Sequence, residues 1–102
     1  MMKVRLLPEA EAEVDEAVEW YDRQEYGVGE RFLRAVREAT QSVAENPERY
    51  PVCATLRSGD ALRRILLTRF PYAIVYHVDQ EDVLVIAVAH GARRPGYWRG
   101  RI

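Results

Sequence analysis

The sequence predicts a single α+β domain over residues 1–102, with the element order β-α-α-β-β-β and a helical hairpin packed on one face of a small antiparallel sheet. Two segments of the N-terminal half carry apolar residues at helical spacing. The C-terminal half instead carries short runs of strand-forming residues separated by polar turns. A chain of 102 residues is large enough for one hydrophobic core and too small for two.

The first strand and the first helix meet at Pro8. Residues 3–7 alternate briefly between polar and apolar, and the residue before a proline favours an extended backbone. Pro8 suits the first turn of a helix, where its missing N–H is not needed. We expect this helix to end before Gly27, and we interpret its many carboxylates as a solvated face. Its apolar stripe consists of Ala10, Val14, Ala17, Val18 and Tyr21.

The second helix follows the turn Gly27-Val28-Gly29 and ends at Asn46-Pro47. A short turn between two helices makes them an antiparallel hairpin. Each helix has one apolar stripe, so both helices need a third surface that buries it, and the strands supply that surface. The stripe of the second helix consists of Phe32, Val36, Ala39 and Val43.

Three strands are expected in the C-terminal half, over residues 61–68, 72–78 and 83–90, after an irregular segment at 51–60. The links between them are short, so neighbouring strands must run antiparallel. Alternation places Tyr72, Ile74, Tyr76 and Val78 on one face, and it places Leu84, Ile86, Val88 and His90 opposite Val85, Ala87 and Ala89. Since the helices cover one face, we expect the other to be open and to gather arginines and aromatic rings.

Charge is distributed unevenly along the chain. Residues 1–50 hold 12 acidic and 7 basic side chains, a net of −5, whereas residues 51–102 hold 4 acidic and 8 basic ones, a net of +4. Fourteen of the 15 basic residues are arginines, whose forked guanidinium binds phosphate or carboxylate in two-point fashion. One interpretation is that the charged residues only cover the solvent-exposed faces of helices, which favour Glu and Arg. The alternative is a strand half that faces an anionic partner, whether RNA, DNA or an acidic peptide.

Several classes of function lack support in the sequence. No apolar run approaches the roughly 20 residues of a membrane span, and the start has no signal-peptide region, so we expect a cytoplasmic protein without membrane contact. The single Cys53 cannot form an internal disulfide, and we interpret it as a passive thiol. With two histidines and no phosphate-binding glycine loop, no metal and no cofactor are expected.

Basic and aromatic residues of the C-terminal half form the remaining candidate site. Cleaving RNA without a metal needs groups that move protons, which His and Tyr can do, and cations for the developing charge, which Arg supplies. Tyr97 or Trp98 could stack on an unpaired base. Alternatively, Tyr72, Tyr76 and Trp98 could be core or rim aromatics and Arg93-Arg94 a solvated turn, but for the cluster as a whole we favour binding. The candidates are Arg63, Arg64, Arg69, Tyr76, His90, Arg93, Arg94, Tyr97 and Trp98.

Five segments together resemble the RelE/ParE superfamily of toxins from bacterial type II toxin–antitoxin systems. The resemblance implies the fold derived above. It also implies a small growth-inhibiting toxin that a cognate antitoxin neutralises in a hetero-oligomer. The segments are Glu19-Trp20-Tyr21, Gly27 to Phe32, Glu45 to Pro51, Arg69 to Tyr76 and His90 to Trp98.

The superfamily divides by target. RelE-like members are ribosome-dependent, metal-independent mRNA endonucleases, and ParE-like members poison DNA gyrase by protein contact. For a nuclease, the resemblance implies Arg64, Arg93 and Tyr97 as catalytic residues, and His90 joins them because its imidazole can move protons. The candidate partner-binding residues are Arg63, Arg69, Arg94 and Trp98.

One departure from the nuclease pattern favours the ParE-like interpretation. In the nucleases, the aromatic residue that opens the third strand is followed directly by an arginine. The corresponding strand of this chain opens with Tyr72, and the next residue is Ala73. We therefore expect a non-enzymatic toxin with DNA gyrase as its target. A ribosome-dependent mRNA endonuclease and an antitoxin-binding member without toxicity are the alternatives.

Overall fold

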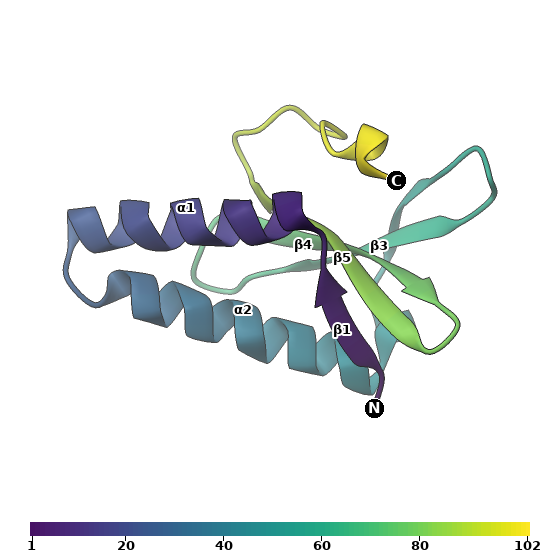
Figure 1. The fold of residues 1–102 in the computed structure, drawn as a ribbon, viewed down its shortest axis with the longest axis horizontal. Coiled ribbons are helices and arrows are strands. Elements are labelled where there is room, and N and C mark those ends of the chain that lie inside the picture. Colours follow the sequence, from purple (N-terminus) through teal and green to yellow (C-terminus); the bar gives the residue numbers. More distant parts are fainter.

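The computed structural model describes all of residues 1–102 and confirms the predicted α+β class (Figure 1). No helix has the length and hydropathy needed to cross a bilayer. Short 3₁₀ helices occur at Pro47–Arg49 and Arg99–Arg101. The main elements are β1 (Lys3–Leu6), α1 (Pro8–Gln24), α2 (Val28–Glu45), β2 (Val52–Thr55), β3 (Ala61–Leu66), β4 (Tyr72–Asp79) and β5 (Asp82–His90).

The five strands form one sheet in the order β1-β5-β4-β3-β2. The strands β2 to β5 pair antiparallel, which the short links predicted for β3, β4 and β5. β1, however, runs parallel to β5, with Val4 opposite Val83 and Leu6 opposite Val85. The sheet is therefore mixed, and the expectation of a purely antiparallel sheet is wrong at this edge.

β2 lies within the segment that the sequence predicted to be irregular. The strand has only four residues, of which three pair with β3, and the register shifts between Val52 and Ala54. So short and interrupted a run has no clear alternation of its own, and its pairing with β3 makes it a strand. Val52 is exposed, as expected for the edge of a sheet.

A bulge in β5 breaks the alternation that the sequence predicted for this strand. Tyr76 pairs with Val85 and Val75 pairs with Ala87, so Ile86 is an extra residue. Val85 and Val88 therefore both face the helices, while the two residues between them face the other side. The predicted faces are correct in β4 and in β5 as far as Ile86, and the predicted alternation fails from Ala87 on.

Both faces of the sheet are covered. α1 packs across β5 and α2 packs on α1, which buries the two predicted apolar stripes against one face. On the other face the C-terminal segment, residues 91–102, returns over the sheet (Figure 1). The expectation of an open second face is therefore wrong where this segment lies. Trp98 of this segment packs there with Ala54, Leu62, Val75, Ile86 and Ala87.

The helical hairpin is fixed at the start of α2. The Asp22 carboxylate accepts a hydrogen bond from the Gly29 N–H at 2.9 Å, which satisfies one of the free donors of the first turn. A Cβ on Gly29 would lie 2.5 Å from the Val18 carbonyl oxygen. Only glycine lets the two helices approach this closely.

Candidate functional site

A network of side chains lies where β1 leaves the edge of β5. The Leu7 N–H donates to the Val85 carbonyl at 3.0 Å, and Pro8 then begins α1. Beyond Val85, no strand pairs with this edge of β5. Glu13 accepts from the Val88 N–H at 3.0 Å, and Arg101 donates to the Ile86 carbonyl at 3.0 Å. Two side chains thus satisfy backbone groups that β1 no longer reaches.

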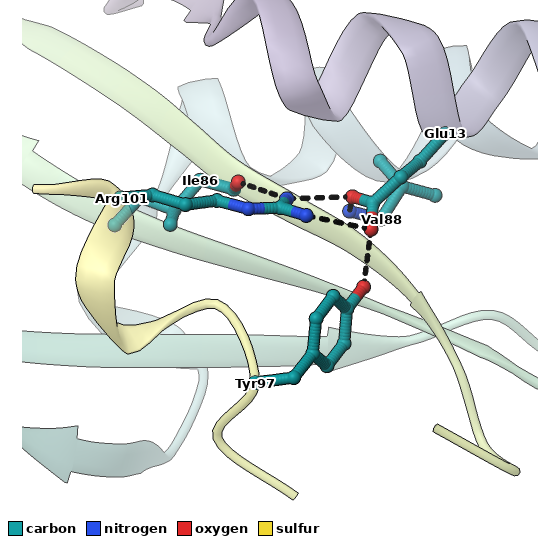
Figure 2. Close-up of polar contacts among 5 residues, drawn as sticks. All are labelled: Glu13, Ile86, Val88, Tyr97 and Arg101. Atoms are coloured by element: carbon teal, nitrogen blue, oxygen red, sulfur yellow. Dashed lines mark hydrogen bonds and ion pairs between the residues drawn. The ribbon is translucent and has the colours of Figure 1, made fainter. Parts of the chain in front are cut away.

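Glu13 and Arg101 also bind each other (Figure 2). The two guanidinium Nη atoms lie 2.8 and 3.1 Å from the two carboxylate oxygens, and the Tyr97 hydroxyl donates to the same carboxylate. The Glu13 and Arg101 side chains are only 12% and 16% exposed. We call Glu13, Tyr97 and Arg101 the Glu13 network. Its hydrogen bonds and ion pair connect the C-terminal segment to α1 and β5.

Ionisation in the Glu13 network follows from these contacts. Burial alone would raise the pKa of Glu13, but hydrogen bonds from Arg101, Tyr97 and the Val88 N–H outweigh it, so the pKa is lowered. Burial, followed by the hydrogen bond to Glu13, raises the pKa of Tyr97 to about 12. At neutral pH the Tyr97 hydroxyl therefore keeps its proton and points it at a carboxylate.

Sequence reasoning missed both partners of this ion pair. The interpretation of the α1 carboxylates as a solvated face is wrong for Glu13. A signal was available, because Glu13 stands three residues after Ala10 and four before Ala17, both of which are buried in the core. A carboxylate on the apolar stripe indicates a buried partner. Arg101 carries no comparable signal in the sequence.

A pocket of about 200 Å³ adjoins the Glu13 network and brings together three of the four predicted catalytic residues. The guanidinium carbon of Arg93 lies 4.0 Å from the centre of the Tyr97 ring. The His90 Nδ1 accepts from the Ala92 N–H at 2.9 Å. Two carboxylates, one of them already paired with Arg101, share the pocket with these groups. It is lined by Glu13, Glu16, Ala17, Trp20, Tyr72, Val88, His90, Arg93 and Tyr97.

The fourth predicted catalytic residue, Arg64, lies on the opposite face of the sheet. It pairs in register with Val75, whose side chain belongs to the core beneath Trp98. There its charge acts on Cys53, although burial is the larger influence and raises the pKa of that thiol. The structure thus brings His90, Arg93 and Tyr97 together and separates Arg64 from them.

The predicted partner-binding residues are dispersed. Arg63 donates to the carbonyls of Glu48 and Tyr50 at 3.1 and 2.6 Å, so it fixes the segment before β2. Trp98 is 7% exposed and is a core residue in this structure. Arg69 and Arg94 are exposed, the first in the β3–β4 link and the second in the C-terminal segment. The expected gathering of these arginines on one open face is wrong.

A second, larger hollow lies between α2 and β3 with the β3–β4 link, and it measures about 900 Å³. Its lining includes Arg69, together with two arginines of α2, Arg31 and Arg34. We call it the α2–β3 groove. No group of three or more His, Cys, Asp or Glu side chains is placed to hold a metal ion.

The helical hairpin on a five-stranded sheet of this order defines a small α+β protein of the RelE/ParE type. The family model described as the ParE toxin of the type II toxin-antitoxin system parDE matches residues 4–95, and the chain belongs to this family. No curated protein matches the chain. A solved structure described as the chromosomal ParDE TA system from P. aeruginosa is similar, with a TM-score of 0.64 and 17% identity over 88% of this chain and 96% of that one. At that identity the likeness shows the fold alone.

Proposed function

We propose that the chain is a toxin that inhibits growth by binding DNA gyrase, and that a cognate antitoxin neutralises it. The observation that carries the choice of target is the state of Tyr97. A nuclease needs this hydroxyl for proton transfer, yet here it donates to Glu13 and its pKa is raised to about 12. A general acid or base works best with a pKa near the ambient pH.

The charges around the pocket support the same choice. Arg64 lies on the other face of the sheet, and Ala73 offers no cation. Glu16 lines the same pocket as Arg93, so an RNA phosphate would meet little net positive charge. Losing one group that stabilises the transition-state charge typically lowers the rate by about 10²–10³. A protein-binding mode of action requires none of these groups.

Induction of the chain in cells without its antitoxin tests the target. We expect growth to stop, a reporter plasmid to lose negative supercoiling, and primer extension to find intact transcripts. In a purified assay, the chain should inhibit supercoiling by gyrase. Transcripts cut within codons only when ribosomes are present, with unaffected gyrase, would contradict the proposal. A folded chain that is harmless on overexpression would instead indicate an antitoxin-binding member without toxicity.

A ribosome-dependent mRNA endonuclease is the second candidate, because His90, Arg93 and Tyr97 line one pocket. The Arg93→Ala variant distinguishes the endonuclease from the gyrase-binding toxin. A nuclease should lose transcript cleavage with this change and keep it with Arg94→Ala, since Arg94 is the exposed neighbour outside the pocket. Both candidate targets are cytoplasmic, which is where we expect the toxin to act.

A further inference from the structure

We infer that the pocket beside Tyr97 is the site at which the toxin contacts its protein target, and that the target presents a carboxylate to Arg93 and a basic side chain to Glu16. A protein as partner rests on the proposed function; the chemistry of its surface rests on the pocket itself. We call this hollow the Tyr97 pocket. It lies where α1, which supplies Glu16 and Trp20, meets the C-terminal segment, which supplies Arg93 and Tyr97.

Two side chains of opposite charge line the Tyr97 pocket and are unpaired. The Glu16 carboxylate has no basic nitrogen within 4.0 Å, and the Arg93 guanidinium has no carboxylate within that distance. Both residues are exposed. Glu13, the other carboxylate of the pocket, is already bound within the Glu13 network. One acidic side chain and one arginine are therefore left for a partner.

Arg93 is held in position before any partner binds. Its guanidinium carbon lies 4.0 Å from the centre of the Tyr97 ring, and that ring is itself fixed because its hydroxyl donates to Glu13 (Figure 2). Two other unpaired arginines lie over rings, Arg49 and Arg99, and each is 5.7 Å from the ring centre. The Arg93 N–H also donates to the last carbonyl of β5 at 3.0 Å. A side chain that is already ordered loses less conformational entropy on binding.

Aromatic rings form the apolar part of the Tyr97 pocket. Trp20 is 50% exposed, and Tyr72 packs edge-on against His90 with ring centres 5.0 Å apart. Trp, Tyr and Arg are the residues that contribute most binding energy in protein interfaces. The volume of about 200 Å³ is below the roughly 300–1,000 Å³ of a small-molecule site. The pocket therefore fits a side chain of a protein surface better than a whole small molecule.

The pair of opposite charges favours a protein over a nucleic acid. A nucleic acid offers only phosphates along its backbone, so Arg93 would attract it and Glu16 would repel it. A protein surface can place an acidic and a basic side chain next to each other and match both.

A second copy of this chain fits the Tyr97 pocket less well. A two-fold contact could pair Glu16 of each copy with Arg93 of the other. It would, however, set two hollows against each other with no side chain to fill either, and interfaces are packed as densely as protein interiors.

Neutralising the two charges separately tests the inference. Arg93→Gln and Glu16→Gln each remove a charge that has no partner in the structure, so the fold should be retained, as circular dichroism and thermal melting would verify. The probe is purified DNA gyrase, with binding measured by calorimetry. We expect each change to lower the affinity about tenfold, because each removes one ion pair with the target. The matched controls are Arg37→Gln and Glu11→Gln, two exposed residues outside the pocket, and each should change the affinity less than about threefold.

The direction of the Glu16→Gln effect distinguishes the alternative partners. Loss of this negative charge should weaken binding to a protein that supplies a cation, and it should strengthen binding to RNA. Ribosome-dependent transcript cleavage that rises with Glu16→Gln and disappears with Arg93→Gln would assign the pocket to RNA and overturn the inference. A concentration-dependent dimer of the wild type that both changes weaken would assign it to a second copy. Unchanged affinity for gyrase in both variants would exclude the pocket as the target site.

Failure of the proposed function gives a different result. If the wild type does not bind gyrase, the choice of target is wrong, and growth arrest on induction replaces affinity as the readout. Arrest that both variants lose, with folded protein and intact transcripts, would support the Tyr97 pocket as the contact with another protein. Arrest that both variants retain would overturn the inference, and a wild-type chain that causes no arrest would overturn it together with the proposed function.

Discussion

The Glu13 network and the α2–β3 groove both contain arginines, and they use them in opposite ways. In the Glu13 network, Arg101 is nearly buried and binds both oxygens of one carboxylate. In the groove, Arg34 and Arg69 are exposed and have no carboxylate within reach. Arginine therefore stabilises the fold in the Glu13 network, whereas in the groove its guanidinium groups are free to contact a partner.

This difference shows what a charge count can and cannot reveal. The C-terminal half carries a net charge of +4, but part of that charge is neutralised by Glu13 of the N-terminal half. Meanwhile the N-terminal half supplies Arg31 and Arg34 to the groove. Arginines without a carboxylate within 4.0 Å, such as Arg34 and Arg69, therefore occur in both halves.

Truncating one apolar side chain in the C-terminal segment, which the Glu13 network holds in place, and one in the groove should give the largest contrast. Trp98→Ala removes a ring that fills the core over the sheet, and such truncations cost about 3–5 kcal/mol. Leu66→Ala, in the groove, should change the free energy of unfolding by less than about 0.5 kcal/mol because the side chain is exposed. Urea denaturation of both variants measures the difference. Equal losses would mean that the groove is part of the folding core.

Neutralising one charge in each region should give the next largest contrast. Glu13→Gln leaves Arg101 nearly buried without a counter-ion, and breaking such a pair should cost about 3 kcal/mol. Arg34→Gln should cost less than about 0.5 kcal/mol, since no partner is lost. Thermal melting at pH 7 compares the two.

A double variant separates the lost ion pair from other effects of Glu13→Gln. Adding Arg101→Met removes the unpaired charge and keeps most of the side-chain volume, so it should recover part of the lost stability. An additive second loss would show that Arg101 stabilises the chain through contacts other than Glu13.

The elements could be predicted from the sequence because each has a local cause. Pro8 and Gly27 bound the first helix, and short polar links force β3, β4 and β5 to pair antiparallel. β2 and the bulge at Ile86 could not be predicted, because both depend on pairing with a neighbouring strand rather than on their own residues. Local periodicity carries no information about such pairing.

The candidate site was predictable only in part. His90, Arg93 and Tyr97 follow one strand end, so their meeting in one pocket follows from proximity in the chain. Arg101 and Glu13 are 88 residues apart, and only the return of the C-terminal segment brings them together. The same return buries Trp98, which no pattern in a basic, glycine-containing tail indicates.

The smallest expected contrast between the two regions is in how the free energy of unfolding changes at acidic pH. The folded pKa of Glu13 lies below its ordinary value of 4.5, so the folded state binds this proton less readily than the unfolded state. The stabilisation is therefore present above about pH 4.5 and is lost as the pH falls through the folded pKa. Melting temperatures of the wild type and Glu13→Gln should converge below pH 4.5, whereas Arg34→Gln should follow the wild type at every pH. A constant gap between the wild type and Glu13→Gln down to pH 3 would mean that the carboxylate charge contributes no stability to the Glu13 network.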